Sequence, residues 1–588
     1  MKTVIEELTA VMEEAFMAAG YDGKYAKVGL SNRPDLCEYQ CNGAMAAAKE
    51  YKKAPIMIAG EVADLLKDKD IFEEVNSVAP GFLNLKLSPV YLADYLGKMG
   101  KDECLGVEET GKGERIIIDY GGPNVAKPLH VGHLRSAIIG ESVKRICRFM
   151  GSEVIADIHL GDWGLQMGLI MTELRKMKPD LVYFDEDYTL DYPKEPPFTL
   201  SELEEIYPRA SARSKTDEAY KEEAMNDTFL LQKGDRGRTA LWKHIMSVSI
   251  PDLKKNYEKL NVSFEVWKGE SDSRPYITDM VNMMKDRGYA YESEGALVVD
   301  IKEETDVKEI PPCMILKSDG AALYTTTDLA TIVQRVESNN PTRFIYVADK
   351  RQEMHFTQVF RCAKKTGLAA PQVKLDFLGF GTMNGRDGKP FKTRDGGVMR
   401  LETLLEDIND EMYKKIIENH DADENEAKET AAIVAMAAVK YGDLSNQATK
   451  DYIFDTEKFT SFEGNTGPYI LYTIVRIKSI LNKYEGMGNS LKGLTLAPAL
   501  DDIGKGLMLE LVKFNQVMIN AYEELAPHKI CAYIYDTANA FNRFYHETRI
   551  LDEEDKKKQE SYIALLIVTK RFLEKGIELL GFNAPEKM

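Results

Sequence analysis

Histidine, tryptophan and cysteine are scarce in this chain. Its 588 residues include 8 His, 3 Trp and seven Cys, an odd number spread from Cys37 to Cys531. Only Cys37 and Cys41 lie close together, and no second pair completes the four ligands of a structural zinc site. This scarcity excludes a disulfide framework. It predicts free thiols in a reducing cytoplasm and no structural zinc.

Long hydrophobic runs and excess positive charge are also missing. The longest apolar candidate, AAIVAMAAV at 431–439, ends at Lys440, well short of the roughly 20 residues of a membrane span. The N-terminus, MKTVIEELTAVMEEAF, predicts an acidic amphipathic helix and not a targeting peptide. With 95 Asp and Glu against 76 Lys and Arg, the formal net charge is −19. We therefore expect no membrane and no DNA partner, although local basic patches could still bind RNA.

A strand, a loop, a helix and a second strand follow one another near the first quarter of the chain. Residues 115–120, RIIIDY, form the β-branched run of a buried strand. A loop precedes a helical pattern at 133–150, and EVIADIHL at 153–160 is again typical of a strand. This order predicts a βαβ unit in a parallel sheet, hence a Rossmann-like domain.

The predicted fold class is α/β plus all-α, with the parallel-sheet domain between an N-terminal α+β domain and a C-terminal helical bundle. We expect about two to four domains for a chain of this length. The boundaries that we predict are an α+β domain at 1–108, the Rossmann-like domain at 109–405 with a helical insertion at about 165–290, a connecting helical region at 406–455 and a bundle without strands at 456–588.

Strand signals return after the insertion. GALVVDI at 295–301 is one, and MILKSDGAALYTT at 314–326 suggests a hairpin around Ser-Asp-Gly. RFIYVAD at 343–349 and VKLDFLGFG at 373–381 follow a helical stretch. We expect these segments to form the second half of the same sheet.

The loop YGGPNVAKPLHVGHLRSAI, residues 120–138, places His130 and His133 around Gly132 at a helix N-terminus. Such a loop follows the C-terminal end of a parallel strand, where open sheets bind ligands, and the helix N-terminus favours phosphate. Gly132 would let a flat base approach, and the imidazoles would donate hydrogen bonds to phosphate oxygens. The alternatives are a polar helix cap and a metal pair, which two ligands leave incomplete.

HVGH resembles the first signature of class I aminoacyl-tRNA synthetases, and the longer string PNVAKPLHVGHLRS is similar to arginyl-tRNA synthetases. Four more segments carry this resemblance from near the N-terminus to the last residue: EYQCNGAMAAAK at 38–49, GDWG at 161–164, GPYILY at 467–472 and LLGFNAPEKM at 579–588. The resemblance implies activation of L-arginine by ATP with Mg²⁺, tRNA-dependent in this family, and transfer to tRNA(Arg).

The resemblance also implies two sets of binding residues. Carboxylates in forked geometry suit the guanidinium of arginine. The arginine-site residues would be Asp119, Asn124, Tyr324, Asp328 and Gln352. The ATP-site residues would be His130, Gly132, His133, Gly161, Asp162, Lys389, Lys392 and Arg394. Asp119 replaces the Glu of some relatives, so a water or a shifted pose would compensate for its shorter side chain. Taken singly, Asp119 could instead interact with a helix dipole or stabilise a turn, and Tyr324 could be a half-buried tyrosine of the core.

The second class I signature, KMSKS, is missing. Its place is GTMNGRDGKPFKTRDGG at 381–397, where only KTR is similar to a variant form. In family members without the motif, a lysine just before the first signature is thought to substitute, which makes Lys127 a candidate catalytic residue beside His130 and His133. Lys389, Lys392 and Arg394 are either pyrophosphate contacts or a solvated basic turn, since charge on leaving pyrophosphate needs a cation.

Both ends resemble tRNA-binding modules of the family. At the N-terminal end, Phe82 and Asn84 would contact the tRNA elbow, unless Gly81-Phe82 is a buried turn. In the bundle, aromatic residues alternate with Arg and Lys, as in surfaces that stack RNA bases. Helical spacing nevertheless favours core packing for Tyr533, Tyr535 and Phe544. No dimerisation stripe is evident, so we expect a cytoplasmic monomer.

Two other functions fit parts of the pattern. A class I synthetase for another amino acid, such as cysteine, would need a zinc set that the scattered thiols do not supply. A catalytically inactive paralogue that binds tRNA or acts as a scaffold would fit the missing KMSKS motif. The intact His130, Gly132 and His133 argue against the second alternative.

Overall fold

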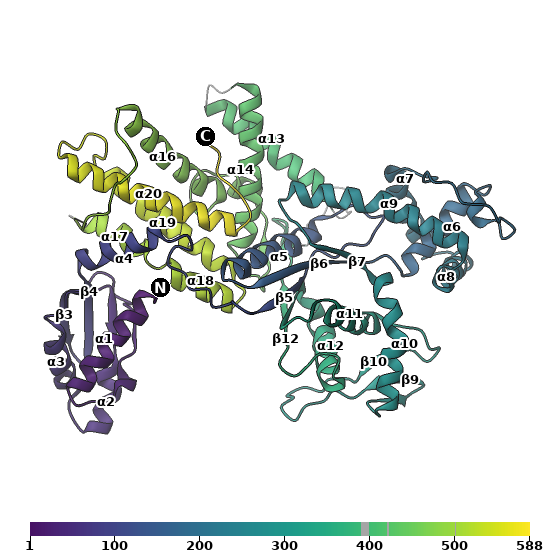
Figure 1. Ribbon diagram of the computed structural model, residues 1–588. Helices are drawn as coiled ribbons and strands as arrows, with labels where there is room; N and C mark the ends of the chain where they lie inside the picture. Colours follow the sequence, from purple (N-terminus) through teal and green to yellow (C-terminus); the bar gives the residue numbers. More distant parts are fainter. Residues whose placement is uncertain (390–398, 420–422, 500) are drawn as a thin grey trace.

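A five-stranded parallel sheet forms the centre of the chain (Figure 1). The computed structural model describes residues 1–389, 399–419, 423–499 and 501–588. The strand order is β12-β11-β5-β6-β7, and every neighbouring pair is parallel. The strands are β5 (Arg115–Asp119), β6 (Glu153–Leu160), β7 (Val266–Gly269), β11 (Arg343–Asp349) and β12 (Lys374–Phe380). The parallel sheet expected from the sequence is therefore confirmed.

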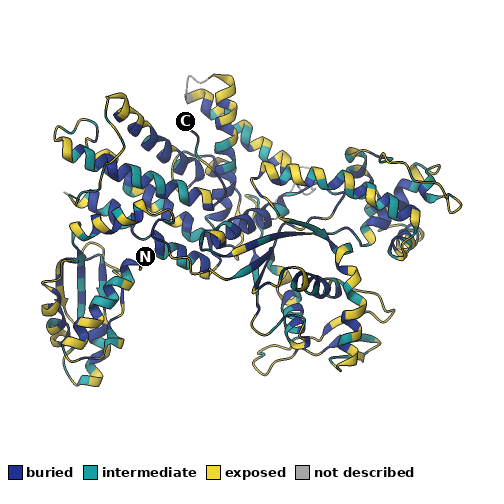
Figure 2. Cartoon of the chain, viewed as in Figure 1, coloured by how far each residue is buried: buried dark blue, intermediate teal, exposed yellow. Residues whose placement is uncertain are grey.

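Strand β5 is buried on both faces because helices cover both sides of the sheet. Its three isoleucines alternate between two cores: Ile116 and Ile118 pack with residues of α5 (Val131–Phe149), while Ile117 packs with residues of α11 (Tyr324–Asn339) and α12 (Glu353–Thr366). A continuous apolar run is typical of a strand covered in this way. The central strands are accordingly dark in the burial view (Figure 2).

Four helices separate β6 from β7 and project from the sheet. They are α6 (Leu165–Met177), α7 (Leu200–Arg213), α8 (Glu218–Lys233) and α9 (Arg236–Lys259), with the short turn η2 (Val182–Phe184). The range 165–290 assigned to this insertion also holds β7 and α10 (Glu270–Asp286), and β7 is an edge strand of the parallel sheet. The sequence pattern does not predict this strand, because VWKG has no apolar run; three of its four residues are only half-buried.

The strands expected to complete the sheet divide between two sheets. β11 and β12 join the parallel sheet, as expected, but β9 (Ala296–Val299) and β10 (Cys313–Leu316) do not. They form a separate antiparallel sheet with β8 (Ala290–Ser293), beside α10 and α12. The expected hairpin is reduced to one bridge between Leu316 and Ala322. A short turn joins β8 to β9, and a longer loop brings β10 back beside β9, so these strands pair with one another and not with the parallel sheet.

The N-terminal domain is a four-stranded antiparallel sheet, order β1-β2-β4-β3, packed against helices. Its elements are α1 (Val4–Ala18), η1 (Gly23–Tyr25), β1 (Val28–Leu30), β2 (Tyr39–Cys41), α2 (Gly43–Tyr51), α3 (Pro55–Leu66), β3 (Phe72–Val78) and β4 (Phe82–Leu87). In β4 burial alternates strictly, with Leu83, Leu85 and Leu87 buried. This period of two is the pattern of a sheet with one covered face.

Helices make up most of the chain after β12. They are α13 (Leu401–Asn419), α14 (Glu424–Leu444), α15 (Thr456–Phe459), α16 (Gly467–Gly486), α17 (Asp502–Leu511), α18 (Phe514–Glu523), α19 (Pro527–Glu547) and α20 (Lys556–Leu579). Helix α4 (Pro89–Lys101) packs against α17 and so joins the N-terminal domain to this bundle. One short strand interrupts the expected helical region: β14 (Tyr452–Ile453) pairs with β13 (Met383–Asn384). Among the described residues, no helix combines the length and apolar character needed to cross a membrane.

Candidate active site

The loop between β5 and α5 is tied to both neighbouring structures. The N–H of Gly121 donates to Ser136 Oγ on α5 at 2.8 Å, and the N–H of Ala126 donates to Ser249 Oγ on α9 at 3.1 Å. Ala126 has φ +58°, in the left-handed region that costs a residue with a Cβ roughly 1–2 kcal/mol. The hydrogen bond that Ala126 donates to Ser249 of the insertion thus helps to hold a strained turn directly before Lys127.

The two histidines stack at the start of α5, with ring centroids 3.9 Å apart. Each Nδ1 accepts a backbone N–H: His130 Nδ1 from Gly132 at 3.0 Å and His133 Nδ1 from His130 at 3.2 Å. An accepting nitrogen carries no proton, so in a neutral ring the hydrogen lies on Nε2. Both imidazoles therefore present an Nε2–H donor, as expected for a phosphate-binding pair, while also capping the helix.

Both imidazoles are neutral near physiological pH. Burial lowers the pKa of His133 to about 3, with His130 and Lys127 acting in the same direction. Burial, followed by Lys127, also lowers the pKa of His130. Neutral donors orient phosphate oxygens without adding a second formal charge next to Lys127.

The segment that follows the expected KMSKS position returns beside the histidine loop. His130 and Arg400 form an antiparallel bridge, and the N–H of Val131 donates to the carbonyl of Met399 at 3.0 Å. Lys389 lies in a tight turn in which its carbonyl accepts from Gly385 N–H at 2.8 Å. The predicted contacts Lys392 and Arg394 lie outside the described residues.

Helix α7 of the insertion lies against both segments. The Lys127 ammonium is 4.1 Å from the centroid of the Tyr207 ring, and Arg400 pairs with Glu204 at 3.0 Å. Tyr207 and Glu204 lie one turn apart on α7. Lys127 is half-buried and lies over an aromatic face, and it forms no ion pair with a carboxylate among the described residues. Its charge is therefore available to an anion.

Asn124 and Gly161 lie side by side at the ends of two neighbouring strands. They form a parallel bridge, and a Cβ at position 161 would overlap Asn124 Oδ1. Gly161 is therefore needed for the close approach of this amide. Asn124 itself is exposed at the sheet edge, where a ligand can reach it.

Asp162 is buried, unlike its neighbour Gly161. Its carboxylate accepts hydrogen bonds from the Ser271 N–H at 3.0 Å and from Ser271 Oγ at 2.6 Å, at the start of α10. Burial raises its pKa despite these two bonds. The carboxylate of Asp162 thus joins β6 to α10, and its predicted contact with ATP stays a prediction.

Asp119, expected to bind arginine, already holds a guanidinium of the chain. Arg335 donates to Asp119 Oδ2 at 2.6 Å and to Asp157 Oδ2 at 2.8 Å, and also contacts the Tyr346 hydroxyl at 3.2 Å. Burial opposes its charge, but Asp157 and Asp119 keep the pKa of Arg335 well above its ordinary value. A role for Asp119 in substrate binding must therefore use its remaining oxygen.

The other expected arginine-site residues approach the same edge from α11 and α12. Tyr324 begins α11 and is 76% exposed, so it is not a core tyrosine. Asp328 lies one turn later, and its Oδ2 is 2.5 Å from His355 Nε2. Gln352 is the exposed N-cap of α12. The starts of α11 and α12 are thus joined by the contact between Asp328 and His355.

Glu270, at the start of α10, was not expected from the sequence. It accepts a hydrogen bond from the backbone N–H of Trp163, and burial raises its pKa to about 7, followed by the charges of Asp162 and Asp328. Partial desolvation of the Tyr324 hydroxyl, followed by the charge of Glu270, raises the pKa of Tyr324. Only recognition of β7 would have placed Glu270 at the ligand-binding edge of the sheet. A half-buried carboxylate among other carboxylates favours a cationic ligand.

The predicted tRNA contacts lie on the N-terminal sheet. Phe82 and Asn84 occupy the half-exposed face of β4, and Asn84 Oδ1 accepts from Gln40 at 2.8 Å. Of Gly81 and Phe82, only Gly81 is buried, and it packs so closely on Pro55 that a Cβ at position 81 would overlap it.

In the bundle, core packing is confirmed for Tyr533 and Phe544, which are buried, and Tyr535 packs on Tyr469. Tyr472 and Tyr545 remain more than a third exposed. Between them lies Arg476, whose guanidinium is 4.8 Å and 4.9 Å from the two ring centroids.

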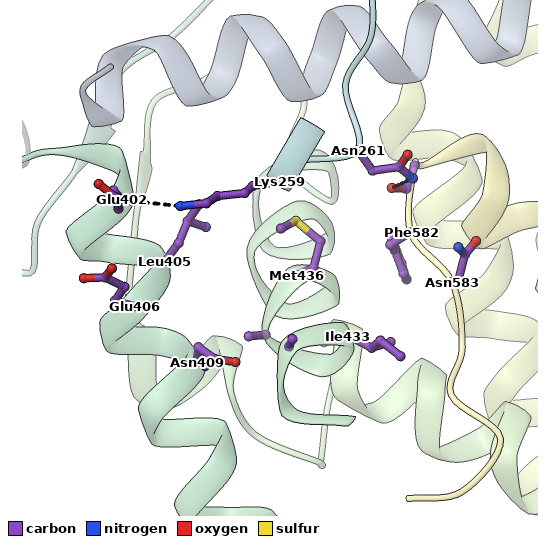
Figure 3. A pocket seen from close by; sticks show the side chains of 13 residues that line it. Lys259, Asn261, Glu402, Leu405, Glu406, Asn409, Ile433, Met436, Phe582 and Asn583 are labelled. Atoms are coloured by element: carbon purple, nitrogen blue, oxygen red, sulfur yellow. Dashed lines mark hydrogen bonds and ion pairs between the residues drawn. The ribbon is translucent and has the colours of Figure 1, made fainter. Parts of the chain in front are cut away.

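A cavity of about 590 Å³ lies apart from these residues (Figure 3). Its walls come from the end of α9, from α13 and α14, and from residues 581–583, and Lys259 pairs with Glu402 across one side at 2.7 Å. None of the predicted site residues that the structure describes lines it. Across the described parts of the chain, no three His, Cys, Asp or Glu side chains are grouped to hold a metal ion.

Family models match three parts of the chain. The model described as tRNA synthetases class I (R), catalytic domain, matches residues 99–456. The Arginyl tRNA synthetase N terminal domain matches residues 2–87, and the DALR anticodon binding domain matches residues 470–588.

Curated relatives and solved structures agree over the whole length. The chain is 64% identical over 597 residues to the arginine–tRNA ligase of Agathobacter rectalis and 55% identical over 588 residues to that of Alkaliphilus oremlandii, with 100% of each chain covered. The fold is similar to arginyl-tRNA synthetases from Plasmodium falciparum (TM-score 0.81, 24% identity) and Thermus thermophilus (TM-score 0.78, 22% identity), again over 100% of both chains.

Proposed function

Since the chain belongs to the arginyl-tRNA synthetase family of class I, we propose that it attaches L-arginine to tRNA(Arg) at the expense of ATP. The observation that carries this proposal is the stacked pair of neutral imidazoles at the start of α5. Two neutral Nε2–H donors at a helix N-terminus, where the helix dipole favours anions, are suited to the phosphates of ATP.

In the first step, the arginine carboxylate attacks the α-phosphorus of ATP in line, giving arginyl-adenylate and pyrophosphate. His130 and His133 would donate to the phosphate oxygens, and Gly132 and Gly161 would leave room for the nucleotide. Lys127 would face the β- and γ-phosphates, which its proximity to the histidines supports. Mg²⁺ would arrive on the ATP phosphates.

The arginine site that we propose has a carboxylate for each end of the substrate. Asp328 and Glu270 would hold the guanidinium, with Tyr324 and Gln352 at the entrance. Asn124 and the free oxygen of Asp119 would hold the α-amino end. The surrounding acidic charge suits a cationic amino acid and disfavours a neutral one, which would leave buried carboxylates unpaired.

In the second step, the 2′-hydroxyl of the terminal tRNA adenosine attacks the acyl carbon, and AMP leaves. The rest of the tRNA would contact both ends of the chain: the open face of β4 with Phe82 and Asn84, and the bundle near Tyr472, Arg476 and Tyr545. Exposed aromatic rings around an arginine can stack on RNA bases. We further propose that the protein is a cytoplasmic monomer. Its free cysteines are consistent with a reducing compartment.

Charging of total tRNA with each of the twenty amino acids, in the presence of ATP and Mg²⁺, tests the proposal. We expect arginine alone to be attached and the His133→Ala variant to lose most of the rate. Tight tRNA binding without any charging would instead identify an inactive paralogue. Attachment of another amino acid would refute the arginine-site assignment.

A further inference from the structure

Asp328 has a hydrogen-bond partner that the sequence did not reveal. His355 Nε2, on the first turn of α12, lies 2.5 Å from Asp328 Oδ2 on α11. The two side chains are 27% and 25% exposed, so the pair lies at the rim of the site and not within the core. A carboxylate oxygen only accepts, so Nε2 carries the hydrogen whether or not the ring is charged.

This contact restrains a carboxylate in repulsive surroundings. The charge of Asp328 acts on Glu270 and on the buried Tyr346, and Asp162 also acts on Glu270. Without a donor, repulsion would turn the Asp328 side chain away from Glu270 and towards solvent. With Oδ2 held by His355, the orientation of the carboxylate is restrained, and Oδ1 has no hydrogen-bond donor among the described residues.

We propose that His355 is a positioning residue that aims the Asp328 carboxylate at the guanidinium of the substrate. The proposal rests on the proposed arginine site and adds a specificity determinant to it. A guanidinium is recognised through a planar fork of N–H groups, so the direction of the acceptor matters as much as its charge. His355 contacts Asp328 and not the histidine pair proposed to bind ATP, so we expect its effect to fall on arginine and not on ATP.

The test compares His355→Ala with His355→Gln, whose amide nitrogen reaches the place of Nε2. For His355→Ala we expect the arginine KM to rise about tenfold or more. Removal of the hydrogen-bond partner of a metal-binding side chain lowers metal affinity or activity on this scale, and we expect a similar effect for the carboxylate that binds the guanidinium. The ATP KM should stay within about twofold of wild type. His355→Gln should recover most of the lost arginine affinity, and Met354→Ala, an exposed neighbour on the same helix, should behave as wild type.

Thermal unfolding of each variant separates misfolding from misplacement. If His355→Ala unfolds, the folded His355→Gln variant tests the proposal instead. Its arginine KM should then lie near the wild-type value. An unchanged arginine KM in folded His355→Ala, an equal rise in both KM values, or no recovery in folded His355→Gln would overturn the proposal. Failure of the wild type to charge arginine would instead refute the proposed function, so the two failures are distinguishable.

Discussion

At the scale of single residues, three carboxylates of the candidate site are held in different ways. Arg335 holds Asp119 and His355 holds Asp328, while Glu270 accepts from the backbone N–H of Trp163. Burial, followed by the charges of Asp162 and Asp328, raises the pKa of Glu270 to about 7. The charge of Glu270 therefore changes close to neutral pH.

We expect the arginine KM to fall as the pH rises from about one unit below to one unit above 7, because only ionised Glu270 attracts a guanidinium. Steady-state kinetics across this range measure the effect, and the slope should vanish in Glu270→Gln. For the unliganded protein the sign for stability is opposite. The folded pKa exceeds the unfolded value of 4.5, so stability from this group is present at low pH and is lost between pH 4.5 and about 7. An identical slope in Glu270→Gln would contradict the assignment.

Replacement of Arg335 should destabilise the fold strongly. Arg335→Leu would leave Asp119 and Asp157 without their cation, and removal of one partner of a buried ion pair costs about 3–5 kcal/mol. Arg335→Lys keeps the charge but not the planar fork, so it should lose less. Urea denaturation compares the two, and equal stability of both variants would show that the charge has no such role.

At the scale of elements, Gly140 allows α5 to pack closely against Tyr120, the residue that follows β5. Tyr120, buried directly after β5, lies where a side chain of residue 140 would project, and its hydroxyl donates to Glu141 Oε2 at 3.0 Å. The helix that begins with the histidine pair is thus set against the strand that precedes their loop. Any change of this distance would move His130 and His133.

Gly140→Ala should therefore lower both stability and charging, although alanine is the better helix former by about 1 kcal/mol. Its Cβ would overlap the Tyr120 ring, and overpacking in a core typically costs about 1–3 kcal/mol. Gly97→Ala in α4, where a Cβ would have no neighbour within 4 Å, is the matched control and should stabilise slightly. Denaturation and charging rates measure both, and a stabilised, fully active Gly140→Ala would contradict this packing.

At the scale of the whole molecule, α5 also fastens the end of the helical bundle. Arg145 donates to the Glu578 carbonyl at 3.0 Å, and Ser142 donates to that of Leu579 at 3.0 Å. Lys440 on α14 donates to the Gly581 carbonyl at 2.7 Å. The end of α20 and the residues directly after it thereby join the sheet domain to the bundle, next to the cavity of Figure 3.

Lys440 should make this junction sensitive to pH. Burial lowers its pKa from 10.5 to about 7, so between these values the unfolded chain binds more protons and stability rises with pH. Lys440→Met removes the buried amine, while Asn261 Nδ2 still donates to the Gly581 carbonyl at 3.0 Å. We expect this variant to be more stable than wild type near pH 7 by an amount that shrinks towards pH 10.5. A constant difference across denaturation series would disprove the shift.

The sequence by itself determined the βαβ core, the histidine pair at a helix start and the helical bundle. These features rest on local signals, such as the isoleucine run of β5 and the helical periodicity of α5, which neighbouring residues carry. The full-length family resemblance likewise depends on motifs that can be read along the chain. Local patterns of this kind are already present in the unfolded chain, because they join residues only a few positions apart.

Only the tertiary structure decided the partners of the charged residues. Asp119 meets Arg335 across 216 positions, and Asp328 meets His355 across 27. Glu270 lies at the site because the short strand β7, which directly precedes it, forms an edge of the parallel sheet. GALVVDI does not belong to that sheet, because its strand β9 pairs with β8 and β10. Sheet partners and ion pairs depend on which distant segments pack together, and that choice is made by burial over the whole core and not by the local sequence.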